Sequence, residues 1–367
     1  MEAFHEQHER REQGGSASLT ADGATFLADR AAILQAIAAP GGEGAQQLRL
    51  SANRLRHRAV GDAIHLRGLI EFSNHCRNNC HYCGLRRDNR DLARYRMTPA
   101  AIVAAAARGA ELGYRTVVLQ SGEDPAFTGP ILAEVVRAIK GLGLVVTLSV
   151  GEREPWEYEL WRKAGAERYL MRHETADAEL YRRLHPGQSL AKRIALLKVL
   201  KQLDYQVGTG FMVGLPGQTP EMLLADIDLA VELAAEMVGI GPFIPHPATP
   251  LAASPGGTVD RACLMVALAR LALPYALIPA TTALGSIDPQ GRELALESGA
   301  NVMMPNLTPR LHRADYQIYP NKICINEEAD HCRGCITGRI LGLGRVVADD
   351  PGHHPLWLER NQAPGPA

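Results

Sequence analysis

Three cysteines that stand close together in the sequence are the residues best suited to chemistry. Cys76, Cys80 and Cys83 occur in CRNNCHYC, directly after an apolar run typical of a buried strand. Three thiolates on one short loop can bind three corners of a four-iron cluster, which normally takes four cysteine ligands. One iron is then left open for a ligand from outside the chain. The spacing therefore predicts a cluster with a chemical role beyond electron storage.

The alternative for this loop is a structural zinc site. Zinc prefers four closed ligands, in paired Cys or Cys/His arrangements. His81 lies between two of the cysteines and is a poor fourth ligand. The spacing thus favours the iron–sulfur cluster.

The elements that must position this loop alternate between short apolar runs and amphipathic helical stretches. A closed parallel barrel of the (β/α)8 TIM type requires eight strand–helix units, and a six-stranded doubly wound sheet is the alternative. In a barrel the cysteine loop follows the carboxyl end of the first strand, where barrel active sites are built. The predicted strands are 65–73, 116–122, 144–151, 168–174, 206–214, 237–245, 276–284 and 301–306.

The chain divides into four predicted regions. Residues 1–18 form a disordered tail, and 19–60 form N-terminal helices that extend the barrel. Residues 61–315 form the complete (β/α)8 barrel. Residues 316–367 form a C-terminal segment that contains the second cysteine group and ends in a loosely ordered Pro- and Gly-rich tail.

The composition excludes several classes of protein. Lys plus Arg number 39 against 40 Asp plus Glu, which disfavours a generally basic nucleic-acid binder. No stretch approaches the roughly 18 apolar residues of a membrane span. The polar start MEAFHEQHERREQGG lacks the apolar core of a signal peptide. We therefore expect a cytoplasmic protein, in which clustered cysteines indicate metal binding or catalysis rather than disulfides.

The cysteine loop resembles the C-x3-C-x-aromatic-C signature of the radical S-adenosylmethionine (SAM) superfamily, with Tyr82 at the aromatic position. The resemblance implies a [4Fe-4S] cluster whose open iron binds the amino and carboxylate groups of SAM. It also implies that one electron cleaves SAM to methionine and a 5′-deoxyadenosyl radical. The cofactor then carries the difficult chemistry, and the protein supplies orientation and exclusion of water.

Residues at other strand ends match SAM-binding motifs of that superfamily. Glycine permits close backbone approach, an acid can pair with an ammonium, and Arg can pair with a carboxylate. For any one of these residues, a plain turn or a surface ion pair is the alternative explanation. By resemblance, the SAM-binding residues are Tyr82, Ser121, Gly122, Glu123, Arg172, Glu174, Arg193 and Met237.

A longer set of motifs resembles the [FeFe]-hydrogenase maturase family HydE. The match runs from about Gly68 to Cys335 and includes RRDN, SGEDP and GPFIPHP. It implies action on a cysteine-bound iron dicarbonyl–cyanide complex made by the partner HydG, with the product passing towards the scaffold HydF. It also implies a reducing electron donor. The predicted substrate residues are Gln120, Thr147, Arg168, Thr281, Thr282 and Tyr316, with the two adjacent threonines at the end of the seventh strand.

A second cysteine group, Cys324, Cys332 and Cys335, also matches HydE, some members of which carry an accessory iron–sulfur cluster, [2Fe-2S] or [4Fe-4S]. Zinc with His331 as fourth ligand is the alternative. We assign this group no catalytic role. The remaining cysteine, Cys263, lies in an apolar helical run and is predicted to be buried in the core.

Two other functions compete with the maturase prediction. A 3-methylornithine synthase is a radical SAM mutase with a similar barrel, and its amino-acid substrate suits the same Arg and Thr residues. A non-catalytic iron–sulfur carrier would not need SAM-directed acids and glycines. Biotin synthase is disfavoured, because its sulfur-donating cluster needs cysteines that do not occur between Cys83 and Cys263.

Overall fold

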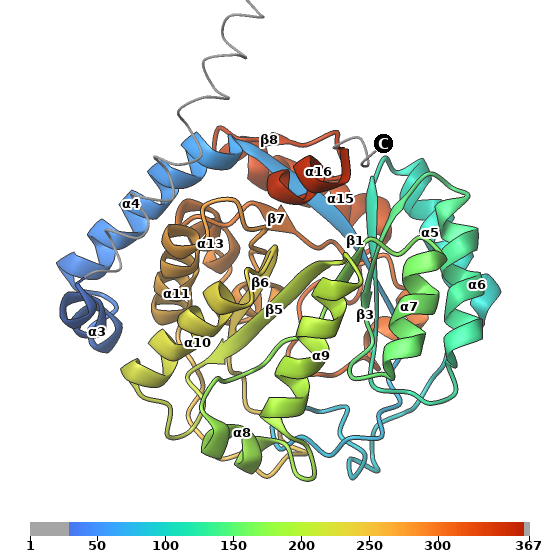
Figure 1. The fold of residues 1–367 in the computed structure, drawn as a ribbon, viewed down its shortest axis with the longest axis horizontal. Coiled ribbons are helices and arrows are strands. Elements are labelled where there is room, and N and C mark those ends of the chain that lie inside the picture. The colour runs from blue at the N-terminus through green and yellow to red at the C-terminus, as the bar shows by residue number, and fades with distance from the viewer. Residues whose placement is uncertain (1–28, 363–367) are drawn as a thin grey trace, which may run out of the picture.

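The computed structural model describes residues 29–362. Its strands are parallel, and neighbours follow the order β6-β5-β4-β3-β2-β1-β7, with β8 paired to β1. The sheet lies at the centre and helices surround it (Figure 1). The strands are β1 (Ala63–Ser73), β2 (Thr116–Ser121), β3 (Val145–Ser149), β4 (Arg168–Leu170), β5 (Gln206–Val213), β6 (Met237–Pro242), β7 (Val302–Met303) and β8 (Val346–Val347).

Helices connect successive strands and pack their apolar faces on the sheet. Thr98 and Thr219 cap two of them by accepting hydrogen bonds from the backbone N–H groups of Ala101 and Met222, so the Thr-Pro starts are genuine helix starts. The helices are α3 (Arg30–Ala38), α4 (Glu43–Val60), α5 (Pro99–Glu111), α6 (Gly129–Lys140), α7 (Pro155–Lys163), α8 (Ala178–Leu184), α9 (Leu190–Gln202), α10 (Pro220–Glu232), α11 (Val259–Ala272), α12 (Thr282–Ile287), α13 (Gly291–Glu297), α14 (Arg310–Arg313), α15 (Ala329–Gly342) and α16 (Pro355–Gln362).

The complete eight-stranded barrel was predicted, but residues 276–284 do not form its seventh strand. Within this segment Leu277 makes a single bridge to Met237 of β6, and Pro279 makes one to Val302 of β7. Proline has no N–H, so it interrupts a continuous ladder at this position. The segment then enters α12. The architecture is therefore a curled parallel sheet of seven strands in continuous order, arranged like part of a TIM barrel.

The regions outside the sheet include the predicted N-terminal helices and a buried Cys263. Helices α3 and α4 pack on α10 and α11, as N-terminal helices should, whereas the predicted tail of residues 1–18 lies outside the described part of the chain. Cys263 is buried on α11, which confirms its assignment to the core. No helix within residues 29–362 is long and apolar enough to cross a membrane.

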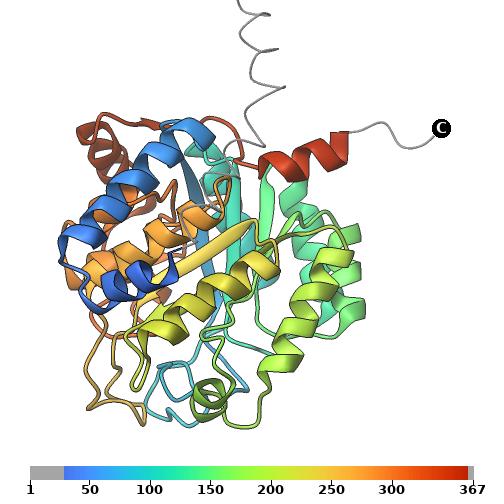
Figure 2. The same ribbon diagram turned by 60° about the vertical axis from the view of Figure 1, so that its left-hand side comes forward.

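The C-terminal residues, predicted to be loose, are ordered as far as α16. They cover the amino ends of the strands, at the opposite end of the sheet from the loop that follows β1 (Figure 2). The buried guanidinium of Arg168 donates to the carbonyl oxygens of Pro351 at 2.8 Å and Gly352 at 2.7 Å. Burying such a charge without hydrogen bonds is costly, so these contacts order a segment that its composition alone would leave loose.

His353, in this segment, provides a test by pH. Its Nδ1 accepts hydrogen bonds from Arg168 at 3.3 Å and Gln206 at 2.7 Å, because an arginine can only donate. Burial, and then the charge of Arg168, lower the pKa of His353 from 6.5 to about 3. Below pH 6.5, His353 therefore binds a proton in the unfolded chain but stays neutral in the folded chain. Stability is full above that pH and falls as pH drops, by at most about 1.4 kcal/mol per pH unit.

Urea unfolding at pH 7, 6 and 5 measures this slope. We expect His353→Gln to flatten it, because glutamine does not titrate. An equal slope in the variant and the parent protein would contradict the account.

Candidate functional site

The loop after β1 is held in shape by a partly buried cation, Arg94. Arg94 donates hydrogen bonds to four backbone carbonyl oxygens of the loop, which a guanidinium with five N–H groups can satisfy together. These acceptors are Asn74 at 2.5 Å, Leu85 at 3.0 Å, Arg86 at 2.8 Å and Asn89 at 3.1 Å. The loop that carries the cysteines is therefore braced from within.

The same loop approaches the end of β2 very closely. Gly122 N donates to Ser73 O at 3.1 Å, and Arg77 N donates to Glu123 O at 3.0 Å. A Cβ at position 122 would collide with the carbonyl oxygen of His75 and lie 2.8 Å from the Cβ of Cys76. Only glycine permits this approach, so Gly122 places Cys76 beside Glu123.

The three cysteines of the loop share one partly buried environment. Burial, and then the neighbouring Cys76, raise the pKa of Cys80 to about 12. Burial also raises the pKa of Cys83, followed by the effects of Cys80 and Cys76. Each negatively charged thiolate thus raises the pKa of its neighbours, and a cationic partner is needed to hold all three as thiolates. This donor set fits an iron–sulfur cluster.

A single bound metal ion would require several ligating side chains to converge on one point. Within residues 29–362, no three His, Cys, Asp or Glu side chains stand close enough to hold one ion. A cubane distributes its cysteine ligands over separate irons, so its three thiols need not converge on one point.

The far side of the cysteine loop is attached to the end of α8. His81 N donates to Leu184 O at 2.9 Å, and the Tyr82 hydroxyl lies 2.9 Å from Nε2 of His185. The Nδ1 of His185 faces Tyr181 O at 3.1 Å, so Nδ1 carries the proton and Nε2 accepts from Tyr82. Burial lowers the pKa of His185 to about 3, which keeps this tautomer neutral.

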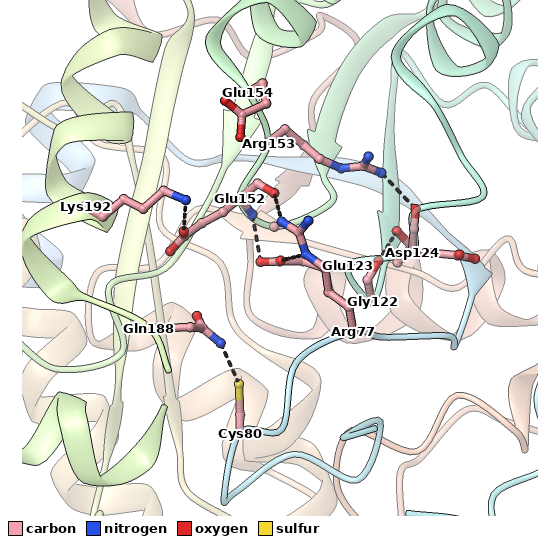
Figure 3. A network of polar contacts seen from close by, with 12 residues as sticks. Arg77, Cys80, Gly122, Glu123, Asp124, Glu152, Arg153, Glu154, Gln188 and Lys192 are labelled. Atoms are coloured by element: carbon pink, nitrogen blue, oxygen red, sulfur yellow. Dashed lines mark hydrogen bonds and ion pairs between the residues drawn. The ribbon is translucent and has the colours of Figure 1, made fainter. Parts of the chain in front are cut away.

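Glu123, at the end of β2, is held from two sides. Its Oε2 accepts from Arg77 Nε at 3.0 Å, and its Oε1 accepts from the backbone N–H of Glu152 at 2.8 Å (Figure 3). Gly151 has a φ of 77°, and a Cβ there would collide with the Glu123 side chain. The end of β3 is therefore shaped around this carboxylate.

Arg193 joins the ends of β3 and β4. Its Nε donates to Glu152 Oε1 at 2.8 Å, and its Nη1 donates to Arg172 O at 2.8 Å. Burial opposes its charge, but the neighbouring Tyr181 and Glu152 outweigh burial and raise its pKa. A buried and permanently charged guanidinium thus stands between two strand ends, where it can bind a carboxylate.

The end of β4 carries backbone strain. Glu174 has a φ of 66°, which non-glycine residues rarely adopt, and its carboxylate pairs with Arg172 at 2.7 Å. The adjacent His173 is fully buried, with Nδ1 2.8 Å from Thr209 Oγ1 and Nε2 3.3 Å from Asp226 Oδ1. These two contacts fix His173 and thereby the backbone that orients the side chain of Glu174.

Comparison with known proteins identifies the family. The model of the radical SAM superfamily matches residues 70–230. The [FeFe] hydrogenase maturase subunit HydE of Thermotoga maritima is 51% identical over 82% of this chain and 86% of its own length. The chain belongs to the HydE family. It is accordingly a radical SAM enzyme of the HydE maturase type.

More distant relatives have the same fold. The 3-methylornithine synthase of Methanosarcina barkeri is 31% identical over 73% of this chain and 76% of its own length. The crystal structure of methylornithine synthase superposes with a TM-score of 0.73 at 27% identity, covering 83% of this chain and 90% of that one. The maturase HydG of Carboxydothermus hydrogenoformans, with a TM-score of 0.72 at 20% identity over 95% of this chain and 83% of its own, is similar in fold alone.

Most of the SAM-directed residues predicted for a HydE protein lie together. Hydrogen bonds join Glu123 to Arg193 through Glu152 and join Arg193 to the end of β4, while Gly122 directly precedes Glu123. Ser121 belongs to the same strand end, where its hydroxyl donates to Gly122 O at 2.7 Å. Tyr82 lies near Glu174 and Arg193, and its hydroxyl forms a hydrogen bond with His185.

The predicted substrate residues are dispersed along the interior. Gln120 donates to the hydroxyl of the buried Tyr316 at 3.2 Å. Thr147 lies in the middle of β3, and its buried hydroxyl has no hydrogen-bond partner in the structure. Arg168 opens β4 and Met237 opens β6, so both lie at the amino ends of strands, away from the cysteine loop. The structure therefore does not bring Met237 to the other SAM-directed residues.

The two adjacent threonines are not at a strand end as predicted. Thr281 caps α12 and Thr282 is its first residue. The Thr281 hydroxyl is buried without a hydrogen-bond partner in the structure, whereas Thr282 lines a cavity with Cys324 and Cys332. The cause is the proline-interrupted segment that replaces the seventh strand.

The second cysteine group is only partly assembled. Cys324 accepts a hydrogen bond from Cys332, which lowers the pKa of Cys324 to about 6 and raises that of Cys332. Cys335 is exposed on α15. His331 is also exposed whereas Cys332 is buried, because adjacent helical residues point in different directions. His331 is therefore badly placed to complete a zinc site with Cys332.

Sequence reasoning missed two residues of the site. Glu152 directly follows the predicted strand 144–151, so the rule that found Glu123 and Glu174 at strand ends applied equally to it. Gln188 lies in a turn between α8 and α9, and no local pattern distinguishes it.

Gly122→Ala tests the close approach of the loop. We expect the added methyl group to push the cysteine loop from β2, at a cost of about 1–3 kcal/mol, and to remove most of the iron bound after anaerobic reconstitution. Gly44→Ala, on α4 where a Cβ meets nothing within 4 Å, is the matched control. Full iron binding by the Gly122 variant would show that the approach is not needed.

Proposed function

We propose that this HydE-family enzyme cleaves SAM reductively and acts on a cysteine-bound iron dicarbonyl–cyanide complex during assembly of the [FeFe]-hydrogenase active site. One observation carries the proposal. The cysteine loop, the acidic end of β2 and the buried Arg193 belong to one hydrogen-bonded network in a chain 51% identical to a HydE maturase.

Cys76, Cys80 and Cys83 would hold the [4Fe-4S] cluster. When bound, that cluster supplies the electron that cleaves SAM to methionine and a 5′-deoxyadenosyl radical. The chain's own task is to bind and orient SAM and to exclude water. Buried charges around the loop suit this task, because they are already paired and fixed in position.

The charged residues of the network match the ammonium and the carboxylate of the SAM amino-acid moiety. Glu123 would accept the SAM ammonium, Arg193 would bind its carboxylate, and Glu174 would accept hydrogen bonds from the ribose hydroxyls. In the structure each of these is paired internally, with Arg77, Glu152 and Arg172 respectively. Because the amino-acid moiety of SAM brings one ammonium and one carboxylate, that moiety would exchange ion pairs without adding net charge.

The substrate would occupy the interior below this network. Gln120, Thr147, Thr281 and Tyr316 carry polar groups that suit an iron-bound cyanide or a cysteine carboxylate, and the unpartnered hydroxyls of Thr147 and Thr281 support such a role. Arg168 and Thr282 would then act at the cavity margins. The single bridges at Leu277 and Pro279 support closure of the sheet into a complete barrel around this space.

The proposal extends to the cellular setting. HydG would supply the complex, HydF would receive the product, and a low-potential donor would reduce the cluster in the cytoplasm. Cys324, Cys332 and Cys335 would hold an accessory cluster with no part in SAM cleavage.

A methylornithine synthase activity is the second candidate. It is favoured by the 31% identity and the TM-score of 0.73 to such enzymes. A lysine-like substrate would use the same Arg and Thr residues.

The deciding experiment quantifies 5′-deoxyadenosine. The anaerobically reconstituted protein is mixed with SAM and a strong reductant, with and without the iron complex or lysine. Stimulation by the complex, with the adenosyl group attached to its sulfur, supports the maturase. Formation of 3-methylornithine from lysine transfers the assignment to the mutase, and failure to bind or cleave SAM with an intact cluster leaves only an iron–sulfur carrier.

Separate variants distinguish the two cysteine groups. We expect Cys80→Ala to abolish 5′-deoxyadenosine formation, since it removes a cluster ligand, and Cys332→Ala to retain most of it. The measurement is single-turnover product per protein, normalised to iron content. Equal loss in both variants would show that the second group is essential.

A further inference from the structure

Gln188 makes the side-chain contact to a cluster cysteine that no motif predicted. Its Nε2 lies 3.7 Å from Cys80 Sγ, within hydrogen-bonding distance of a sulfur (Figure 3). Gln188 is half-buried in the turn between α8 and α9, and its backbone N–H donates to His185 O at 3.0 Å. The turn that presents the amide is therefore part of the same structure that holds Tyr82.

The direction of this hydrogen bond is determined by Arg193. The Nη2 of Arg193 donates to Gln188 Oε1 at 2.9 Å. A guanidinium has only donors, so the amide oxygen must face Arg193 and the amide NH2 must face the sulfur. Arg193 is fixed in turn by Glu152 and by the carbonyl of Arg172. The donor to Cys80 is thus oriented by a chain of buried contacts.

We propose that Gln188 is a positioning residue that donates a hydrogen bond to the Cys80 thiolate, raises the reduction potential of the cluster, and links that potential to the carboxylate-binding residue Arg193. The inference rests on the proposed cluster at Cys76, Cys80 and Cys83. Reduction adds negative charge to the cluster and its sulfurs. A fixed N–H donor therefore stabilises the reduced state more than the oxidised one, and hydrogen bonds to sulfur are a recognised determinant of cluster potential.

Other charges also act on Cys80, so the test must leave them in place. Arg193 lowers the pKa of Cys80, while Cys76, Glu123 and Glu174 raise it. A substitution of Arg193 would change several of these effects together. Gln188 is uncharged, so its replacement by an uncharged residue of similar length removes the hydrogen bond to Cys80 without removing any charge.

The experiment uses reconstituted full-length protein and measures the midpoint potential of the cluster by redox titration in the absence of SAM. Gln188→Met keeps the length of the side chain and removes the donor. Gln188→Glu also removes the donor, retains an acceptor for Arg193, and adds a negative charge. Gln202→Met, at the exposed end of α9, is the matched control.

We expect a more negative midpoint potential in Gln188→Met, a still more negative one in Gln188→Glu, and no shift in Gln202→Met. Iron content and circular dichroism should match those of the parent protein. An unchanged potential in an iron-replete Gln188→Met or Gln188→Glu protein would overturn the proposal. Loss of the cluster from both folded variants would also overturn it, because Gln188 would then be needed for assembly rather than for tuning.

These outcomes are separate from those of the proposed function. The potential is measured without SAM or substrate, so it reports on Gln188 whatever reaction the enzyme performs. A parent protein with a normal cluster but no SAM cleavage would refute the proposed reaction and leave the hydrogen bond testable.

Discussion

The carboxyl end of the sheet depends on one close contact between backbones. The loop after β1 lies against the end of β2, and the contact exists because position 122 has no side chain. It places Cys76 next to Glu123, so that a thiol of the loop and an acid from a different strand end become neighbours. Arg94 braces the loop from inside, and α8 holds its far side. With these supports, a short loop carries its three cysteines on a fixed framework rather than on a flexible segment.

The charges around this loop form a balanced set. Arg77 pairs with Glu123, Arg193 with Glu152, and Arg172 with Glu174, and the three carboxylates follow the ends of parallel strands. Buried charges without partners would be strongly destabilising, so the structure keeps the site intact before any ligand arrives. A zwitterionic ligand can replace internal partners one for one.

The opposite end of the sheet obeys a related constraint. Arg67 and Arg168 are buried at the amino ends of β1 and β4, and backbone carbonyls of residues 351 and 352 accept their hydrogen bonds. The C-terminal segment is thereby ordered, and β8 adds to β1 beside it. The chain thus covers one end of the sheet with its own backbone and keeps the cysteine loop at the other.

The sequence by itself determined the grouping of the cysteines on one loop, the parallel α/β class, most strand positions and the acids at strand ends, because each follows from local spacing or periodicity. Tertiary structure decided the rest. Pro279 turned the expected seventh strand into single bridges and moved Thr281 to a helix start, while Arg168 ordered a tail that its composition marked as loose. Gln188 meets Cys80 across 108 residues of sequence. Such contacts depend on how strand ends and turns that are distant in sequence pack together in space, and no local sequence pattern predicts that packing.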